Sequence, residues 1–245
     1  MKYEEVKKAF PKQRQELPAE YKAIYDQHYE ENRKGMTKAS SLSSKMESWL
    51  HRKVAKTGGY DKKTLEIGAG TLNQLDYERC ERYDIVEPYE ALFEHSMNKK
   101  YIHNIYKDVL DIPSGETYDR IISIACFEHI CNLPEIVQKT SEMLRSGGIL
   151  AVSIPNQGRF LWKLAYTMTT GSEFKKRFGL DYETLMNYEH VNTADEIEVI
   201  LKHFFRRVKR SFLGVGKTFS LYRYYECSKP KTIHPNHDTT RKSKR

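Results

Sequence analysis

The chain has 245 residues, a length that suits one elaborated domain with a substantial core. Its N-terminus is charged and lacks an apolar run, and no stretch approaches the roughly 20 apolar residues that span a bilayer, so we expect a cytoplasmic protein without a secretory signal or transmembrane segment. The four cysteines have neither CxxC spacing nor a secreted context. We therefore expect reduced, structural thiols.

The formal charge of +8 comes mostly from one end of the chain. Residues 228–245 contain six Lys or Arg residues and one Asp, or +5, which leaves +3 for the rest. This segment has little apolar content, so we expect a disordered, solubilising tail. The alternative is weak attraction to an anionic membrane surface or a polyanion. The location of the charge argues against a nucleic-acid partner.

Residues 1–58 are expected to be helical. Tyr21, Tyr25 and Tyr29 recur at four-residue spacing on one helical face, and packing against the core is the simplest role for that face. Ser44 is a candidate N-cap for a helix from Lys45 to Val54.

Strand and helix patterns alternate in the following part of the chain. We expect strands at 64–68, 82–87, 101–106, 119–125 and 148–154, helices at 71–80, 89–98, 132–145 and 193–205, and a hairpin of 207–213 with 219–225. Such alternation predicts an α/β, doubly wound and mostly parallel sheet covered on both faces. Ligands of such folds bind at the carboxyl ends of the strands.

Residues 157–190 interrupt this alternation. The segment is rich in aromatic and basic side chains, among them Trp162, Lys163 and Tyr166. An insertion at the carboxyl edge of the sheet can form a wall of a substrate pocket, and we expect these three residues to bind substrate. A packing insertion or a dimer surface is the alternative.

The most specific motif is the stretch Thr-Leu-Glu-Ile-Gly-Ala-Gly-Thr at 64–71, followed nineteen residues after Gly68 by Glu87. A carboxylate at this distance from a glycine-rich turn is typical of ribose recognition. Asn73 stands where a dinucleotide-binding turn needs a third glycine, and Glu66 favours a cationic amino-acid group over phosphates. A glycine turn that merely joins strand to helix is the alternative.

These residues resemble the motifs of class I S-adenosylmethionine-dependent methyltransferases, with E-x-G-x-G at Glu66 and an acid after the second strand. Leu72 departs from the fuller E-x-G-x-G-x-G form. Residues 127–130 are similar to the family's L-E-H-[IV] element, and residues 144–150 to L-[RK]-P-G-G-x-L with Ser146 in place of proline. The resemblance covers roughly residues 60 to 227.

The resemblance implies a seven-stranded sheet with an antiparallel last pair, S-adenosylmethionine as cofactor, a helical lid at 1–58, a methyltransferase domain at 59–227 and a substrate cap at 157–190. Within it, Glu87 would bind the ribose hydroxyls and Asp108 the adenine amine. The implied cofactor-binding residues are Glu66, Gly68, Ala69, Gly70, Glu87, Pro88, Asp108, Val109, Ala125 and His129.

The acceptor decides whether the enzyme needs a base. A hydroxyl must lose its proton, whereas an amine needs only its neutral form. We expect His190 to be the catalytic base, ahead of His129, because the insertion ends at His190. The alternatives are a packing or capping role for His190 and a loop contact for His129. Glu128 is expected to orient the loop.

Several absences narrow the acceptor. No N/D-P-P-Y follows the fourth strand, Cys126 lacks the setting of a cytosine-C5 nucleophile, and no aspartate-rich arrangement follows that strand, so no metal is expected. The prediction is methyl transfer to a hydroxyl, or with less support an amine, of a small molecule or glycan precursor in polysaccharide or secondary-metabolite synthesis. The alternatives are an RNA or protein methyltransferase that docks through the tail, and a non-catalytic cofactor-binding protein. The oligomeric state is not predicted.

Overall fold

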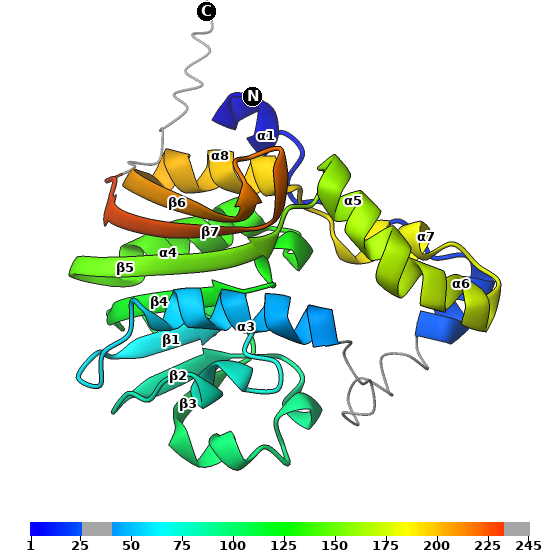
Figure 1. Ribbon diagram of the computed structural model, residues 1–245. Helices are drawn as coiled ribbons and strands as arrows, with labels where there is room; N and C mark the ends of the chain where they lie inside the picture. Colours follow the sequence, from blue (N-terminus) through cyan, green and yellow to red (C-terminus); the bar gives the residue numbers. More distant parts are fainter. Residues whose placement is uncertain (26–40, 233–245) are drawn as a thin grey trace, which may run out of the picture.

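The computed structural model describes residues 1–25 and 41–232, and its centre is a seven-stranded sheet in the order β3-β2-β1-β4-β5-β7-β6 (Figure 1). The first five strands run parallel, and β7 is antiparallel to both β5 and β6. This arrangement confirms the expected fold class and the antiparallel last pair. The strands are β1 (Thr64–Ile67), β2 (Tyr83–Val86), β3 (Ile102–Tyr106), β4 (Tyr118–Ile124), β5 (Leu144–Pro155), β6 (Phe205–Val215) and β7 (Phe219–Pro230).

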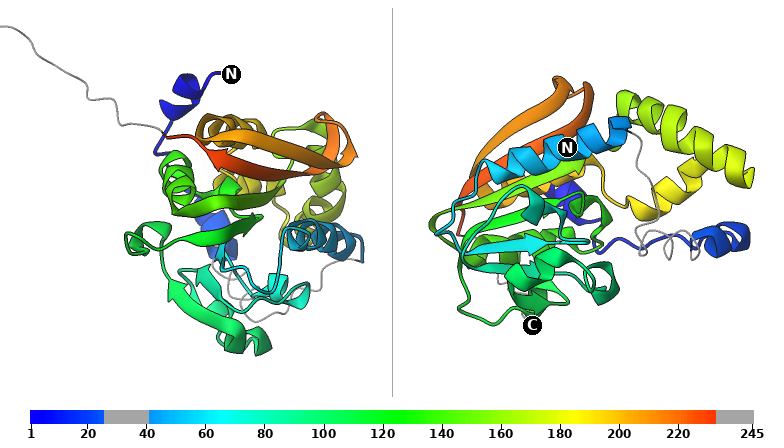
Figure 2. Two further views of the ribbon diagram at one scale, coloured as in Figure 1. Left: turned by 90° about the vertical axis from the view of Figure 1, so that its left-hand side faces the viewer. Right: turned by 60° about the horizontal axis from the view of Figure 1, so that its bottom comes forward.

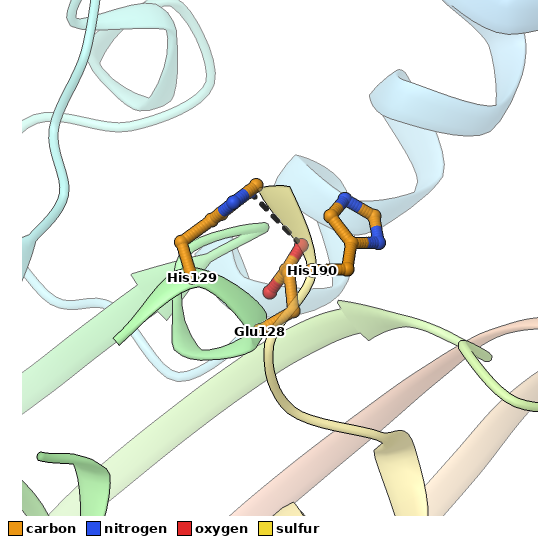
Figure 3. Close-up of side chains that lie close together, drawn as sticks. All are labelled: Glu128, His129 and His190. Atoms are coloured by element: carbon orange, nitrogen blue, oxygen red, sulfur yellow. Dashed lines mark ion pairs between the residues drawn. The ribbon is translucent and has the colours of Figure 1, made fainter. Parts of the chain in front are cut away.

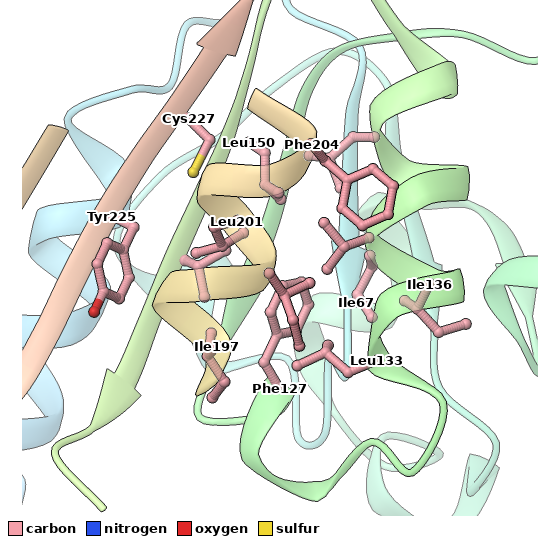
Figure 4. Packing of buried hydrophobic residues seen from close by; sticks show 14 of the residues in the cluster. Ile67, Phe127, Leu133, Ile136, Leu150, Ile197, Leu201, Phe204, Tyr225 and Cys227 are labelled. Atoms are coloured by element: carbon pink, nitrogen blue, oxygen red, sulfur yellow. The ribbon is translucent and has the colours of Figure 1, made fainter. Parts of the chain in front are cut away.

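Helices cover both faces of the sheet. On one face, α4 (Leu133–Met143) and α8 (Ala194–Phe204) bury Ile136 and Leu201 against strand residues such as Ile67, as Figure 4 shows. The short α1 (Tyr3–Lys7) packs on α8. On the other face, α3 (Ser41–Ala55) contributes Leu50 and Val54 to a second cluster. Both crossover helices predicted at 132–145 and 193–205 are confirmed.

The helices predicted at 71–80 and 89–98 are wrong. Short 3₁₀ turns stand there instead: η1 (Asn73–Asp76), η2 (Glu90–Leu92) and η3 (Met97–Tyr101). Leu72 has a φ of 66°, and this left-handed conformation stops the chain from entering an α-helix after the glycine turn. Because α3 contacts η1 and packs with Leu72, this helix covers much of the face that a crossover helix would protect.

The N-terminal residues pack on the insertion. Residues 19–25 are helical, and Tyr21 is buried in a cluster with Phe174 and Leu185. Tyr21 therefore packs, as the simplest interpretation of the tyrosine face predicts, while Tyr29 lies outside the described residues. Helix α3 already includes Ser41, so Ser44 lies inside it and is not its N-cap.

The insertion is a row of helices: α5 (Phe160–Tyr166), the π-helical η6 (Thr167–Gly171), α6 (Ser172–Phe178) and α7 (Tyr182–Glu189). It follows the carboxyl end of β5 and extends from that end of the sheet (Figure 1). Figure 2 shows the helix of residues 19–25 at the same end of the molecule. The insertion thus stands where ligands of doubly wound sheets bind.

The C-terminal boundary differs from the expected one. Strand β7 continues to Pro230, and the Lys231 backbone N–H donates to the Phe204 carbonyl at 2.8 Å, so residues 228–230 belong to the sheet. Residues 233–245, most of the predicted tail, lie outside the described residues. All four cysteines are unpaired, as expected. Within 1–25 and 41–232, no helix is both long and apolar enough to cross a membrane.

A buried ion pair fixes α3 to the sheet. The Arg120 guanidinium is 1% exposed and donates to both oxygens of Glu78, at 2.7 and 2.8 Å. It also donates to the Val54 carbonyl at 3.1 Å, in the last turn of α3, and to Thr57 Oγ1 at 2.9 Å, two residues after that helix. The position of α3 on the sheet therefore depends on Arg120.

We predict that Arg120→Leu lowers the free energy of unfolding by about 3 to 5 kcal/mol, because it leaves the Glu78 carboxylate buried without its partner. Denaturant unfolding measures the change. The double variant Arg120→Leu/Glu78→Leu removes both charges and should recover part of the loss. A single variant as stable as the wild type would contradict this role.

Candidate active site

The glycine turn after β1 lies close against the loop after β4. Gly68 has a φ of 75°, and a Cβ there would lie 2.4 Å from Cys126 Sγ. Only glycine permits this approach. Gly70 has a φ of 50°, and no atom lies within 4 Å of the place where its Cβ would be. The turn therefore leaves the backbone accessible at Gly70, a cradle that suits a ligand.

Glu66 is a buried carboxyl group beside this turn. It is 2% exposed, and the Tyr83 hydroxyl donates to its Oε2 at 2.7 Å. Burial raises the pKa of Glu66 to about 7, although the Tyr83 hydrogen bond and the nearby His51 oppose the rise. A cation bound next to Glu66 would stabilise its charged form. This carboxylate is therefore suited to a cationic ligand.

The turn opens into a cavity of about 480 Å³ between the sheet, α3 and the insertion. Aromatic rings form its outer wall, with Trp162 in edge contact with Tyr222 at 5.2 Å and with Tyr166 at 6.3 Å between ring centroids. The lining residues are Glu47, Leu50, His51, Glu66, Gly68, Ala69, Gly70, Thr71, Asn73, Ile124, Ala125, Glu128, His129, Pro155, Trp162, Tyr166, Thr170, Tyr182, Met186, His190 and Tyr222.

Three titratable side chains meet in this cavity: Glu128 and His129 of η5 (Phe127–His129), and His190 after α7 (Figure 3). His129 Nε2 lies 3.9 Å from Glu128 Oε1, and the two imidazole rings are 4.8 Å apart in an edge contact. His129 Nδ1 is 2.9 Å from the Glu189 carbonyl oxygen. Because a carbonyl only accepts, Nδ1 carries a proton, and in the neutral ring Nε2 keeps a free lone pair.

Burial and mutual charge shift the pKa values of the three groups apart. Burial raises the pKa of Glu128 to about 6. Burial opposes protonation of His129, but the Glu189 carboxylate, whose Oε2 lies 3.3 Å from His129 Nδ1, and the Glu128 charge raise its pKa above the usual value. Burial, with the charge of His129, lowers the pKa of His190 to about 3. His190 is therefore uncharged at neutral pH.

Asn192 holds the two sides of this cluster together. Its side-chain amide donates to the carbonyls of Phe127 at 2.8 Å and Ile130 at 2.7 Å, and its backbone N–H donates to the Glu128 carbonyl at 3.0 Å. Asn192 is fully buried and stands two residues after His190. It therefore ties the end of the insertion to the loop after β4.

The structure divides the predicted cofactor residues into two groups. The residues of the glycine turn and of the loop after β4 line the cavity. Four others follow the ends of β2 and β3 and do not line it: Glu87, Pro88, Asp108 and Val109. Glu87 accepts the backbone N–H of Gly70 at 2.9 Å and of Tyr89 at 3.1 Å. Asp108 and Pro88 are exposed, and Val109 is buried in the core.

The predicted substrate residues are divided as well. Trp162 and Tyr166 line the cavity. Lys163 does not; its side chain is 58% exposed, and its ammonium group lies 2.6 Å from the Glu183 carboxylate. Both predicted catalytic histidines line the cavity and contact each other.

Sequence analysis missed the contribution of α3. Glu47 and His51 line the cavity from this helix, and His51 Nδ1 lies 2.9 Å from Gln74 Oε1. Burial opposes protonation of His51, but its hydrogen bonds with Glu47 and Gln74 raise its pKa. No motif marked these residues. Glu128 could have been found from the sequence, because it precedes His129 in the segment similar to L-E-H-[IV].

Over residues 39–204 the chain matches a protein family described as methyltransferase domain, and the chain therefore belongs to this family. No curated protein matches the chain.

Solved structures show the same fold at low sequence identity. One is an S-adenosylmethionine-dependent methyltransferase from Thermotoga maritima, described as a possible histamine N-methyltransferase, with 15% identity, a TM-score of 0.58, and coverage of 84% of this chain and 98% of that one. Another is the N-methyltransferase NodS from Bradyrhizobium japonicum bound to S-adenosylhomocysteine, with 16% identity, a TM-score of 0.51, and coverage of 78% and 89%.

The plantazolicin methyltransferase BpumL, also bound to S-adenosylhomocysteine, has 15% identity, a TM-score of 0.50, and coverage of 75% of this chain and 82% of its own. The protein is an S-adenosylmethionine-dependent methyltransferase of the Rossmann-like α/β class. Its cofactor is S-adenosylmethionine. The resemblance found in the sequence motifs is thereby confirmed.

We predict that Glu87→Ala weakens binding of S-adenosylmethionine about 10-fold to 100-fold, because a charge-assisted hydrogen bond contributes about 1.5 to 3 kcal/mol. Calorimetric titration measures the affinity, and circular dichroism checks the fold. Glu90→Ala, at a carboxylate that is 69% exposed, is the control and should bind normally. Equal affinity of the Glu87 variant and wild type would remove Glu87 from the cofactor site.

A second prediction concerns pH. The pKa of Glu66 rises from 4.5 in the unfolded chain to about 7 in the folded one, so the folded state holds the Glu66 proton more tightly. The resulting contribution to stability is complete below pH 4.5 and is lost as the pH rises through 7. A glutamine does not titrate, so Glu66→Gln abolishes that loss. The difference in the free energy of unfolding between the variant and the wild type should therefore shift in favour of the variant by up to about 3 kcal/mol from pH 4 to pH 8.

Denaturant unfolding of cofactor-free protein at several pH values measures this difference. Glu81→Gln, at an exposed glutamate, is the control and should show no such trend. A parallel pH dependence in wild type and Glu66→Gln would mean that Glu66 titrates normally in the folded chain.

Proposed function

We propose that this enzyme methylates a hydroxyl group of a small molecule or glycan precursor bound in the cavity, in the cytoplasm. The observation that supports it is the cluster of Glu128, His129 and His190 beside the glycine turn. Bound S-adenosylmethionine supplies an electrophilic methyl group on a sulfonium. The chain's own residues must then align the acceptor, exclude water and deal with the hydroxyl proton.

The turn and its neighbours hold the donor in this proposal. Glu66, Gly68, Ala69 and Gly70 face the cavity, where the buried carboxylate favours the cationic amino-acid end of the donor. Glu87 binds the ribose and, through the Gly70 N–H, fixes the turn. Pro88, Asp108 and Val109 follow the ends of β2 and β3, where the nucleoside would extend, and Ala125 and His129 border the methyl.

The aromatic wall holds the acceptor. Trp162 and Tyr166 present flat apolar surfaces to the cavity, and the Trp162 indole N–H is fixed by the Gln157 side chain at 2.8 Å. A space of about 480 Å³ shared with part of the donor leaves room for a small acceptor or one group of a larger one. Lys163 has no part in this proposal, because Glu183 neutralises it away from the cavity.

The hydroxyl proton passes to a histidine in this scheme. His190 is preferred for its position, since it ends the segment that forms the acceptor wall, although its low pKa makes it a weak base. His129 is the second choice, because it belongs to the loop after β4 and not to the acceptor wall; its Nδ1 contacts Glu189, and its Nε2 is free to accept.

One observation favours an amine acceptor as a second candidate. Glu47, Glu66 and Glu128 line the cavity, and none of the described lining residues is a lysine or an arginine. Carboxylates with aromatic rings suit an ammonium-bearing ligand. Of the structural neighbours, NodS is described as an N-methyltransferase and the Thermotoga maritima protein as a possible histamine N-methyltransferase. An amine would need its neutral form but no strong base.

We predict that His190→Ala lowers turnover of a hydroxyl acceptor by about 10²-fold to 10⁴-fold, because the group that receives the proton is lost, while donor affinity changes little. Transfer of labelled methyl to a panel of hydroxyl and amine metabolites, with donor titration alongside, measures both quantities. His129→Ala is examined in the same way. His103→Ala, at an exposed histidine of β3, is the control.

Normal turnover by both His190→Ala and His129→Ala, together with methylated amine products, would make the amine the acceptor. A wild-type chain that binds the donor but transfers no label to any acceptor would contradict the proposed catalytic function.

A further inference from the structure

We propose that Glu128, His129 and His190 form a binding site for a divalent transition-metal ion, with coordination positions open toward the cavity. One ligand atom from each side chain lies within 4.8 Å of the others. Ligand atoms about 2.1 Å from one ion lie about 3 to 3.5 Å apart, so modest side-chain rotations complete the set. Binding of the ion is independent of which acceptor the enzyme uses.

The Glu128 carboxylate gives the main argument for a cation at this cluster. This side chain is 2% exposed, yet within the described residues its Oε2 has no hydrogen-bond partner. Its other oxygen faces His129 Nε2 at 3.9 Å, beyond hydrogen-bond distance. A buried carboxylate oxygen without a partner destabilises the fold, and a bound cation would satisfy it.

The surroundings orient both imidazoles as metal ligands. His129 donates its Nδ1 proton to the Glu189 carbonyl at 2.9 Å, which leaves the Nε2 lone pair on the side of Glu128. Near His190, the Trp162 indole N–H fixes Gln157 Oε1, and that oxygen lies 3.4 Å from His190 Nδ1. Metal-binding histidines characteristically donate their other ring N–H to an oxygen in this way.

The ligand types indicate the class of ion. Two imidazoles and one carboxylate favour Zn²⁺, Mn²⁺, Fe²⁺ or Co²⁺ over Mg²⁺ and Ca²⁺, which prefer oxygen ligands. Three protein ligands also leave at least one position free. All three residues line the cavity, so that position is accessible to an acceptor.

The role of the ion in catalysis rests on the proposed O-methylation. An acceptor hydroxyl bound to the ion loses its proton to water more readily, because the cation stabilises the oxygen's charge. That oxygen then forms a bond to the methyl carbon of the donor. The carbon–sulfur bond breaks, and its electron pair stays on sulfur.

The test begins with full-length protein stripped by a chelator and dialysed. Titration with Zn²⁺ and Mn²⁺ alone, followed by calorimetry and elemental analysis, should give one ion per chain. Added Co²⁺ should show visible absorption bands of an imidazole-bound ion. Mg²⁺ and Ca²⁺ should bind far more weakly.

Two variants from different elements test the ligands, Glu128→Gln on η5 and His190→Asn after α7. Each should weaken binding by more than the roughly 10-fold to 100-fold that loss of an outer-shell partner causes. His103→Asn, at an exposed histidine of β3, is the matched control and should bind as the wild type does. Circular dichroism confirms folding of each variant.

Less than one ion per wild-type chain, or unchanged affinity in both ligand variants, overturns the metal site. Donor binding and methyl transfer are measured on the same stripped protein. Full activity without metal contradicts only the catalytic role of the ion, whereas a loss restored by Zn²⁺ or Mn²⁺ supports it. Failure to transfer methyl with or without metal counts against the proposed function alone.

Discussion

The arrangement of the cavity depends on one buried amide. Asn192 reaches the carbonyls of Phe127 and Ile130 at 2.8 and 2.7 Å, and its backbone N–H reaches Glu128. Phe127 is itself fully buried in the core against α4 and α8. The loop after β4 is thereby held between the core and the end of the insertion. For this reason His129 and His190, far apart in the sequence, share one corner of the cavity.

The charge of the cavity explains which ligands it can accept. Glu47, Glu66 and Glu128 face it, and the lining residues of the described chain include neither lysine nor arginine. Two of these carboxyl groups are buried, and burial raises the pKa of each above its usual value. A cationic donor reduces the energetic cost of ionising such groups. The sequence predicted that Lys163, a basic residue of the insertion, binds substrate. In the structure its charge is balanced by Glu183 outside the cavity.

The sequence predicted the elements that depend on local residue patterns. Strand periodicity located the strands, and the hairpin signal gave the antiparallel pair β6 and β7. The helix predicted at 71–80 failed because the left-handed Leu72 is a conformational detail that composition does not reveal. Contacts of α3 with the cavity, through Glu47 and His51, are tertiary and carry no motif. The meeting of His129 with His190 likewise required the fold.

The two histidines can act either as a catalytic base or as metal ligands, and the two roles have different consequences for the buried Glu128 carboxylate. A lone pair that coordinates an ion cannot also accept a proton, so a metal-bound His129 or His190 is not the base. The Glu189 carbonyl orients His129 equally well for either role, and Gln157 does so for His190. A bound cation would satisfy the unpartnered oxygen of Glu128, whereas proton transfer to a histidine leaves that buried oxygen as it was. The carboxylate, more than either imidazole, is therefore the group that favours coordination at this corner of the cavity.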